Sequence, residues 1–419
     1  MQTLGNKKKI IIAGGGFGGL NCAVRLARAA RRNKIAAEII LADRNDYHLY
    51  YPNLYEVATS EEEFVSIAAL KKSIALPYAE VLPKEVAFIR GEISAIDQEK
   101  RTAVIAGQAH GFDYLVLSFG SVTDYFGIKG MRESALTLKS LPDALKIRNQ
   151  AEFIFESASM DVRKKLLRII IGGGGFTGVE LAGEMLNLIA ILCWKYNYPR
   201  DKAELLVIEG APQLLPGMPA HISRRVRERL LGLGAQVRLE NFITEADETG
   251  VIVNTGEKIN YDLLIWTGGV RAAALPLNEK ELCDKKGRIM ENSDKFCLQG
   301  CENIFALGDI ACVPDKDNIP LPQTATQAIY ESEYVADAIL CRLLSKPVPA
   351  FRPQSFGYII PVKGKWAVLH LPSGITWYGF LSWIGRRFAD LRYFAKLLPF
   401  WKALRMAWFD AELYVKNDE

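Results

Sequence analysis

Two glycine-rich segments have the residue types and spacing that bind the pyrophosphate of a dinucleotide. Each follows an apolar run, Ile10–Ala13 in the first and Ile169–Ile171 in the second. In such a loop one glycine permits a tight turn, another lets the backbone approach the pyrophosphate, and a third lets helix and strand pack closely. The glycines with this spacing are Gly14, Gly16 and Gly19 in one segment and Gly173, Gly175 and Gly178 in the other. Two loops about one domain apart predict a chain that holds two dinucleotides and passes electrons between them.

An acidic residue ends the second apolar run of each glycine segment. Asp43 follows the run 38–42, and Glu209 follows the run 204–208, later than the usual spacing. A carboxylate at this place accepts hydrogen bonds from the ribose hydroxyls. After Glu209 come Gly210, Ala211 and Pro212, with no Arg or Lys to receive a 2′-phosphate. The second site is therefore expected to take NADH rather than NADPH.

Strands that alternate with helices predict an α/β fold with two Rossmann-like dinucleotide-binding domains. A helix is expected over Gly19–Arg31 and another over roughly 323–344. The glycine segments and the strand 304–306 that ends on Gly308–Asp309 divide the chain into expected domains. Residues 1–130 and 291–355 are expected to form the two parts of one dinucleotide-binding domain, residues 131–290 the other dinucleotide-binding domain, and residues 356–419 a C-terminal region.

The bulk composition of the 419 residues is that of a globular protein, with 49% apolar and 24% charged residues. A net charge of +4 gives no reason to expect a nucleic-acid partner. The seven cysteines form no CxxC pair, which favours a reducing compartment and no metal site. The apolar run after Lys7–Lys9 is too short for a signal peptide, and no stretch reaches the ~20 uncharged apolar residues of a membrane span.

The C-terminal segment 376–409 carries eleven aromatic residues, six Lys or Arg and one acid. A helical stripe contains Phe380, Trp383, Ile384, Phe388, Leu391, Phe394, Ala395 and Leu398. Arg386, Arg392 and Lys396 lie off this stripe, and a second stripe with Trp401, Leu404 and Trp408 has Lys402 and Arg405 opposite. An apolar aromatic face with a basic polar face suits a helix lying in a bilayer surface. A homodimer interface would use the same stripe.

Several longer segments resemble type II NADH dehydrogenase, the NADH:quinone oxidoreductase that does not pump protons. Asn45–Thr59 and Gly120–Ile128 are similar to two specific family segments, and Thr177–Glu184 is similar to the start of its NADH domain. Ile265–Val270 resembles its nicotinamide segment, Ala306–Asp309 its flavin-contacting motif, and Gln323–Gln327 its quinone-site motif. The resemblance covers nearly the whole chain. Pro322, Ile329 and Ser118–Phe119 depart from the family pattern.

This resemblance implies FAD on the first glycine segment, NADH on the second, and a membrane quinone (ubiquinone or menaquinone) as acceptor. It assigns Glu180 to the nicotinamide–flavin junction, and Gln323 and Gln327, four residues apart on one helix face, to the quinone. The expected FAD contacts are Gly14, Gly16, Phe17, Gly18, Gly19, Asp43, Arg44, Gly120 and Asp309. The expected NADH contacts are Gly173, Gly175, Thr177, Gly178, Glu209 and Gly268. The location implied is peripheral, on the cytoplasmic face of a bacterial plasma membrane.

Other flavoproteins share the two glycine segments. A sulfide:quinone oxidoreductase needs redox cysteines beside the flavin, and no cysteine lies between Cys22 and Cys193. A disulfide reductase needs a cysteine pair near Tyr47–Tyr55, where there is none. A ferredoxin or rubredoxin reductase has no need of the aromatic tail. A protein that binds both dinucleotides for signalling, without catalysis, is a further alternative, and NADH-dependent quinone reduction separates it from the enzymes.

Overall fold

The computed structural model describes residues 7–61, 67–160, 165–276, 283–290, 296–298, 300–315 and 317–407. Trp408 and Phe409 of the predicted tail lie outside these residues. Contacts divide the chain into two compact units, each made of three segments. Unit 1 comprises 1–49, 75–122 and 270–356, and unit 2 comprises 50–74, 123–269 and 357–419. The chain passes between the units five times, after residues 49, 74, 122, 269 and 356, of which the third crossing lies within β10 (Ser121–Thr123) and the fourth just before β19 (Val270–Ala272).

Unit 1 is built on a six-stranded sheet in which four successive pairings are parallel. The strands in spatial order are β21 (Cys297–Leu298), β22 (Cys301–Ala306), β9 (Tyr114–Leu117), β1 (Lys8–Ala13), β2 (Ala37–Asp43) and β5 (Val86–Arg90). The edge strand β21 runs antiparallel to β22, whereas all the other neighbours are parallel. The central strand β1 is fully buried from Ile10 to Ala13. An apolar strand buried on both faces is typical of a parallel sheet covered on both sides.

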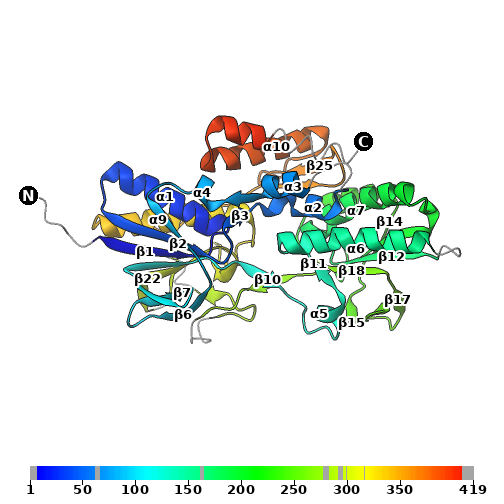
Figure 1. Ribbon diagram of the computed structural model, residues 1–419, viewed down its shortest axis with the longest axis horizontal. Coiled ribbons are helices and arrows are strands. Elements are labelled where there is room, and N and C mark those ends of the chain that lie inside the picture. Colours follow the sequence, from blue (N-terminus) through cyan, green and yellow to red (C-terminus); the bar gives the residue numbers. More distant parts are fainter. Residues whose placement is uncertain are drawn as a thin grey trace, which may run out of the picture. The chain divides into compact units, whose positions relative to one another are not determined.

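Two helices of unit 1 pack against each other beside this sheet, as Figure 1 shows for α1 and α9. Helix α1 (Phe17–Asn33) begins directly after Gly16 and ends at Lys34, whose φ of 54° is left-handed. It is two residues longer at each end than predicted. Helix α9 (Ala325–Leu343) has Thr324 as its N-cap, since the Thr324 hydroxyl accepts a hydrogen bond from the Gln327 N–H. The predicted helix at 323–344 is thus confirmed in its interior and begins two residues late.

The remaining elements of unit 1 are short. The strands β6 (Ile93–Asp97), β7 (Thr102–Ile105) and β8 (Gln108–Gly111) form an antiparallel meander. The others are β3 (Tyr47–Leu49) paired with β4 (Ala75–Pro77), α4 (Tyr78–Val81), β20 (Ile289–Met290) paired with β23 (Ala311–Cys312), and the 3₁₀ turn η4 (Gly308–Ile310). The turn η4 follows β22, so Gly308 and Asp309 lie at the carboxyl end of a central strand.

Unit 2 repeats the same plan with a five-stranded sheet whose neighbours are all parallel. Its strands in order are β11 (Leu136–Thr137), β18 (Leu263–Trp266), β12 (Leu167–Gly172), β13 (Ala203–Ile208) and β14 (Ala235–Arg238). Its helices are α5 (Met131–Ser134), α6 (Leu141–Ser159), α7 (Phe176–Lys195) and α8 (Ala220–Gly232), with the turn η2 (Arg200–Lys202). A second strand–glycine loop–helix unit on its own parallel sheet confirms the predicted α/β class.

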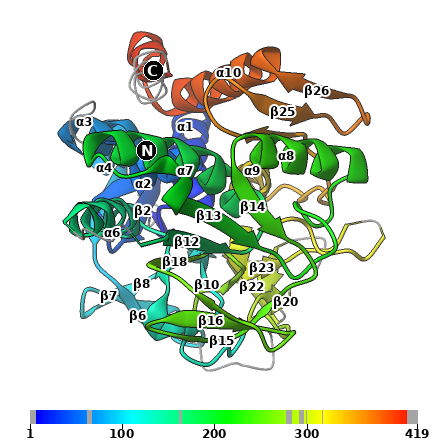
Figure 2. The ribbon, with the colours of Figure 1, turned by 90° about the vertical axis from the view of Figure 1, so that its right-hand side faces the viewer.

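Unit 2 also contains two small antiparallel sheets and the segments next to them. One sheet is β15 (Ile243–Asp247), β16 (Gly250–Val253) and β17 (Lys258–Asn260), and the other is β24 (Tyr358–Pro361), β25 (Ala367–His370) and β26 (Thr376–Gly379). Helix α10 (Phe380–Leu397) follows β26 and packs on β25, as Figure 2 shows. The turn η1 (Tyr51–Asn53), α2 (Leu54–Thr59) and α3 (Ile67–Ile74) complete the unit.

Among the described residues one helix, α7, has the length and hydropathy of a membrane span. Of its apolar window 72% is buried. Because it is the helix that follows the second glycine loop, its apolar character is that of a core helix.

Candidate dinucleotide and substrate sites

The first glycine loop joins β1 to α1 and is held by backbone and side-chain contacts within unit 1. Gly14 has a φ of +101°, and a Cβ on Gly19 would lie 1.9 Å from the Gly14 carbonyl oxygen. The Ser118 hydroxyl donates to the carbonyls of Ala13 and Gly14, each at 2.9 Å. Asp43 Oδ2 accepts from the Gly15 N–H at 2.6 Å. The predicted ribose acid therefore lies directly beside the loop.

The second glycine loop, between β12 and α7, has the same arrangement in unit 2. Gly173 has a φ of +106°, and a Cβ on Gly178 would lie 1.9 Å from the Gly173 carbonyl oxygen. The Thr267 hydroxyl occupies the position equivalent to that of Ser118 and donates to the carbonyls of Gly172 and Gly173. Glu209 Oε2 accepts from the Gly174 N–H at 2.6 Å. The delayed acid thus reaches the same position as Asp43.

Both loops fit the pyrophosphate of a dinucleotide. The space where a Cβ would stand on Gly16 or on Gly175 is open to 4 Å. These two glycines are the N-caps of α1 and α7, and neither helix has a side-chain cap among the described residues or an acid in its first turn. The free N–H groups and the positive end of the helix dipole then face this open space and favour an anion.

Two side chains that support the first loop were missed by sequence reasoning. His48 Nδ1 lies 3.0 Å from the Gly15 carbonyl, and Tyr78 Oη donates to the same oxygen at 2.9 Å. His48 is fully buried, and burial lowers its pKa to about 4. A neutral imidazole therefore holds the loop at neutral pH. His48 belongs to a segment already singled out, whereas Tyr78 is distant in sequence and follows no motif.

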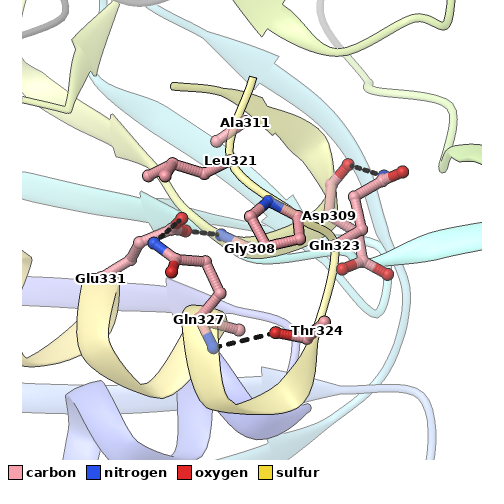
Figure 3. A pocket seen from close by; sticks show the side chains of 10 residues that line it. Gly308, Asp309, Ala311, Leu321, Gln323, Thr324, Gln327 and Glu331 are labelled. Carbon is pink, nitrogen blue, oxygen red and sulfur yellow. Dashed lines mark hydrogen bonds between the residues drawn. The ribbon is translucent and has the colours of Figure 1, made fainter. Parts of the chain in front are cut away.

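A recess in unit 1 is lined by η4 and the start of α9 (Figure 3). The Asp309 carboxylate accepts from the Ser121 hydroxyl at 2.5 Å, and the Asp309 carbonyl accepts from Gln323 Nε2 at 2.8 Å. Gln327 Nε2 donates to Glu331 Oε1 at 3.0 Å. Both predicted quinone-site amides and Asp309 thus line one recess, at the carboxyl end of β22.

The prediction that Gln323 and Gln327 share one helix face is wrong. Because α9 begins at Ala325, Gln323 precedes the helix and its amide is bonded to backbone. Gln327 lies within the first turn and is 2% exposed. Its Oε1 atom is buried and has no hydrogen-bond partner in the described part of the chain. An unsatisfied acceptor at a recess is a place for a donor group of a bound molecule.

Glu331 is a further residue of this recess that sequence reasoning missed. It is 3% exposed, its Oε2 accepts from the Gly308 N–H at 2.7 Å, and its Oε1 accepts from Gln327. Burial raises the pKa of the Glu331 carboxyl to about 7, against the lowering effect of these two hydrogen bonds. The side chain therefore ties the Gly308 turn to α9 and titrates near neutral pH. Its position, four residues after Gln327, was the only signal in the sequence.

The expected nicotinamide segment of unit 2 has an aromatic ring against its backbone. A Cβ on Gly269 would lie 2.6 Å from the Phe126 ring, and a Cβ on Gly268 would lie 2.3 Å from the Trp266 ring. Trp266 Nε1 donates to the Asp124 carbonyl at 2.7 Å, and the Phe126 ring meets Trp266 edge-on. Phe126 is itself 59% exposed. This segment therefore offers an exposed aromatic edge beside two glycines.

Glu180 lies one turn into α7, not in its first turn as predicted, because the helix begins at Phe176. Its side chain is partly exposed. Burial raises the pKa of the Glu180 carboxyl to about 8, Arg386 lowers it, and Glu56 raises it. The helix dipole therefore does not account for an acid at this position. Two other predicted contacts, Arg44 and Thr177, have exposed side chains, and Gly120 has a φ of +70°.

The tail helix α10 exposes only part of the predicted apolar stripe, since Phe380 and Phe388 face outward whereas Phe394 and Leu398 are 1% and 6% exposed. Arg386, expected on the polar face with Arg392 and Lys396, is instead 8% exposed and bonds Asp390. The outward face carries Phe380, Leu381 and Phe388, which are 53%, 75% and 65% exposed, with Arg392 and Lys396 exposed beside them. Trp401, farther along, is 77% exposed. The exposed surface of the tail is therefore apolar with basic residues at its side.

The sequence of residues 8–332 matches the pyridine nucleotide-disulphide oxidoreductase family. The chain is 31% identical over 341 residues to type II NADH:quinone oxidoreductases of Staphylococcus aureus, covering 80% of this chain and 82% of each relative.

Solved structures with the same fold are less similar in sequence. NDH2 from Plasmodium falciparum, in complex with NADH, has a TM-score of 0.83 at 20% identity and is matched over 97% of this chain and 98% of its own. The sulfide:quinone oxidoreductase from Aquifex aeolicus has a TM-score of 0.73 at 19% identity, over 95% of this chain and 92% of its own.

Proposed function

Because this chain belongs to the type II NADH:quinone oxidoreductases, within the pyridine nucleotide-disulphide oxidoreductase family, we propose that it oxidises NADH and reduces a quinone through FAD. The observation that carries this function is the duplicated loop, in which Asp43 and Glu209 each accept from a glycine N–H beside an uncapped helix. Two such loops would bind two dinucleotides. Oxidation of NADH through FAD needs such a pair, with NADH as the electron donor and FAD as the electron carrier. The predicted activity and cofactors thus agree with the family.

The residues of the chain bind and orient the cofactor and the substrates, and they exclude water. FAD, when bound, would supply the acceptance of hydride and the transfer of two electrons. On unit 1, the loop 14–19 holds the pyrophosphate, Asp43 the ribose, and Asp309 the region near the flavin. On unit 2, the loop 173–178 and Glu209 hold NADH. We assign Glu180 to positioning of the nicotinamide side of the reaction, since it is a partly exposed acid on the helix that opens at this loop.

We assign the quinone to the recess lined by Gln323 and Gln327. An amide can donate to a quinone carbonyl without bringing a charge into an apolar pocket. Gln327 Oε1 is an acceptor, so it would receive the O–H of the quinol product rather than bind the quinone carbonyl, and Asp309 and Glu331 in the same recess make it polar. Rates of flavin reoxidation by ubiquinone and by menaquinone, measured side by side, identify the acceptor.

We assign the outward face of α10 and Trp401 to attachment at the cytoplasmic surface of a bacterial plasma membrane. The exposed side chains of Phe380, Leu381 and Phe388 would bury apolar area in the interface. Arg392 and Lys396 would meet anionic headgroups, each contributing ~1 kcal/mol near the surface. A homodimer that covers the same face is the competing account, and light scattering with and without anionic vesicles separates the two.

The absorbance spectrum of the purified protein tests the function most directly. A bound flavin gives its visible bands, NADH should bleach them, and a short-chain quinone should restore them. Reduction of the flavin by NADH without reoxidation by quinone would support a protein-acceptor reductase or a dinucleotide-binding signalling protein instead. In a sulfide:quinone oxidoreductase, sulfide would bleach the visible bands of the flavin. Cys22 does not suit that chemistry, because burial raises the pKa of its thiol.

A further inference from the structure

The carboxyl of Glu331 and the amide of Gln327 form a pair on α9 that the quinone assignment does not yet explain. Gln327 Nε2 donates to Glu331 Oε1 at 3.0 Å, and the Gly308 N–H donates to Glu331 Oε2 at 2.7 Å, as Figure 3 shows. Gln327 is 2% exposed and Glu331 is 3% exposed. Both side chains line the recess that we assign to the quinone. The state of this pair therefore decides which polar atoms a bound molecule meets.

With Glu331 ionised, the amide of Gln327 is poorly matched to a quinone. Glu331 takes one N–H of the amide, and the amide Oε1 is buried without a hydrogen-bond partner in the segments that the structure describes. A quinone has carbonyl oxygens and no O–H group, so it cannot satisfy this acceptor. A quinol can, because its O–H groups donate. The ionised pair therefore favours the product of the reaction over its substrate.

A proton on Glu331 reverses this match. The protonated carboxyl has an O–H group, which donates to Gln327 Oε1 once the amide turns by half a revolution about its last side-chain bond. The two orientations of an amide have nearly the same outline, so the turn needs no repacking. The Gly308 N–H keeps Glu331 Oε2 as its acceptor in both states. Both N–H groups of Gln327 are then free for a quinone carbonyl, and its oxygen is satisfied.

The surroundings of Glu331 allow both states near neutral pH. Burial raises the pKa of its carboxyl to about 7, the hydrogen bonds from Gly308 and Gln327 lower it, and the charge of Asp309 on η4 raises it. A carboxyl without these surroundings would be ionised at neutral pH. Here a small change in pH, or a ligand that prefers one state, shifts the balance between the two orientations of the amide.

The other ionisable groups on the packed elements act elsewhere. Helix α9 packs along α1, where Arg25 bonds Asp337 of α9 at 2.9 and 2.6 Å. Cys22 of α1 is a neutral thiol and Tyr330 of α9 a neutral phenol, since burial raises the pKa of each. The charge of Glu333 acts on Arg25 and on Tyr330. The charge that acts on the carboxyl of the pair is that of the acid in η4.

We propose that Glu331 is a positioning residue that turns the Gln327 amide: when protonated it presents the amide N–H groups to a quinone carbonyl, and when ionised it presents the amide oxygen to a quinol hydroxyl. The proposal rests on the proposed function, since it takes the recess as the quinone site. It involves no covalent step, and the proton on Glu331 exchanges with water. Quinone binding and protonation of Glu331 must then promote each other to the same extent.

Binding to the full-length, FAD-loaded protein in its oxidised state tests the proposal without turnover. The two probes are a short-chain ubiquinone and its quinol, which share ring and tail and differ in carbonyl against hydroxyl. Each is titrated anaerobically across neutral pH, and an indicator dye in weakly buffered solution measures proton uptake on binding. The variants are Glu331→Gln and Gln327→Met. Glu333→Gln is the control, because it removes the same charge from α9 two positions away.

The wild-type protein should distinguish the two probes by their pH dependence. Quinone affinity should fall about tenfold between roughly pH 6 and pH 8, because the fraction of protein with a protonated Glu331 falls by that factor around a pKa of about 7. Quinol affinity should change less than about threefold, because a hydroxyl can donate to Gln327 Oε1 or accept from Nε2. Just above neutral pH, quinone binding should take up about half a proton and quinol binding close to none.

The variants should each hold the pair in one state. Glu331→Gln should keep the strong quinone affinity at every pH and abolish proton uptake, because a glutamine there donates to Gln327 Oε1 and still accepts from the Gly308 N–H. Gln327→Met should show the weak affinity at every pH, since it has no amide to turn. Glu333→Gln should behave like the wild-type protein. An equal pH dependence for quinone and quinol in the wild-type protein overturns the proposal, whichever variants fold.

The outcomes also separate this proposal from the proposed function. NADH-reduced flavin that quinone does not reoxidise refutes the proposed function, whereas the binding titrations still decide whether Glu331 turns the amide. Reoxidation by quinone, together with a quinone affinity that does not change with pH, keeps the proposed function and overturns the role of Glu331. An undiminished quinone affinity in Gln327→Met removes the amide from the quinone site, and the proposal falls with it.

Discussion

Glu209 Oε2 accepts a hydrogen bond of 2.6 Å from the N–H of Gly174, and its Oε1 accepts from the Ala211 N–H at 2.7 Å. Both oxygens are therefore held by backbone, so the carboxylate has a fixed direction before any ligand binds. In unit 1 the carboxylate of Asp43 lies at the same distance from Gly15. An acid fixed in this way can accept from ribose hydroxyls with little loss of side-chain entropy, and it repels a phosphate at the 2′ position.

Glu209 should make the protein prefer NADH over NADPH. We expect kcat/KM for NADH to exceed that for NADPH by about 100-fold, which corresponds to ~2.7 kcal/mol of discrimination. Glu209→Gln keeps the shape of the side chain but removes its charge. The preference should therefore fall at least tenfold, because kcat/KM should fall for NADH and rise for NADPH. Steady-state kinetics with both donors measure this ratio. Equal use of the two donors by the wild-type protein would contradict the assignment.

Gln327→Leu should impair reoxidation by quinone and spare flavin reduction by NADH. The substitution removes the donor to Glu331 Oε1 and the amide that lines the recess, so we expect reoxidation to slow about tenfold and the free energy of unfolding to fall by about 1–3 kcal/mol. Gln323→Leu is the matched control for stability, since its amide bonds the part-buried Asp309 carbonyl of η4 rather than a buried carboxylate. Rapid quinone reoxidation in the Gln323→Leu, Gln327→Leu double variant would remove both amides from the quinone site.

Glu331 should make the protein less stable as the pH rises. Its pKa in the folded state is about 7, above the value of 4.5 expected in the unfolded chain, so the folded state binds more protons between these values. Stability should therefore fall between about pH 4.5 and 7, by at most roughly 3 kcal/mol from this group. Glu331→Gln should flatten that slope. Urea unfolding at a series of pH values measures it, and an identical slope in the variant would show that Glu331 titrates normally.

The exposed apolar residues of the tail should control membrane attachment without affecting the fold. We expect Leu381→Ser with Phe388→Ser to weaken binding to anionic vesicles at least tenfold, because each side chain would otherwise bury area worth about 1.5–3 kcal/mol. Turnover with a long-chain quinone should fall, and turnover with a water-soluble quinone should not. Phe153→Ser is the control, since Phe153 of α6 is similarly exposed at 59%. Unchanged sedimentation of the double variant with vesicles would favour a dimer interface for this face.

Truncation before α10 is not a clean test of attachment, for a structural reason. Tyr50 stacks on Tyr393, and Arg386 and Asp390 are bonded to the segment 50–53. Loss of the helix would expose these buried groups. Point substitutions on its outer face leave those contacts in place, so they separate membrane binding from stability.

The sequence by itself determined the two dinucleotide loops and the acids that serve them. Each loop requires a glycine spacing, an apolar strand before it and a carboxylate after it. These requirements are local, so a stretch of roughly forty residues is enough to recognise them, as Gly14–Asp43 and Gly173–Glu209 show. Helix interiors were also predictable from their periodicity. Helix starts were not, because an N-cap depends on backbone geometry that a pattern does not contain: α9 starts after Thr324 rather than at Gln323, and α7 leaves Glu180 beyond its first turn.

Only the tertiary structure decided which face of the tail is outside and which charges meet inside. A helical stripe specifies two faces but not which one packs, and the hydrogen bonds of Tyr50 to Asp390 and of Arg386 to Asn53 join residues more than 330 positions apart. That pairing buries a polar face and leaves Leu381 and Phe388 exposed. Desolvation, which raises the pKa of Glu56 and Glu331, likewise depends on neighbours brought together by folding rather than by proximity along the chain.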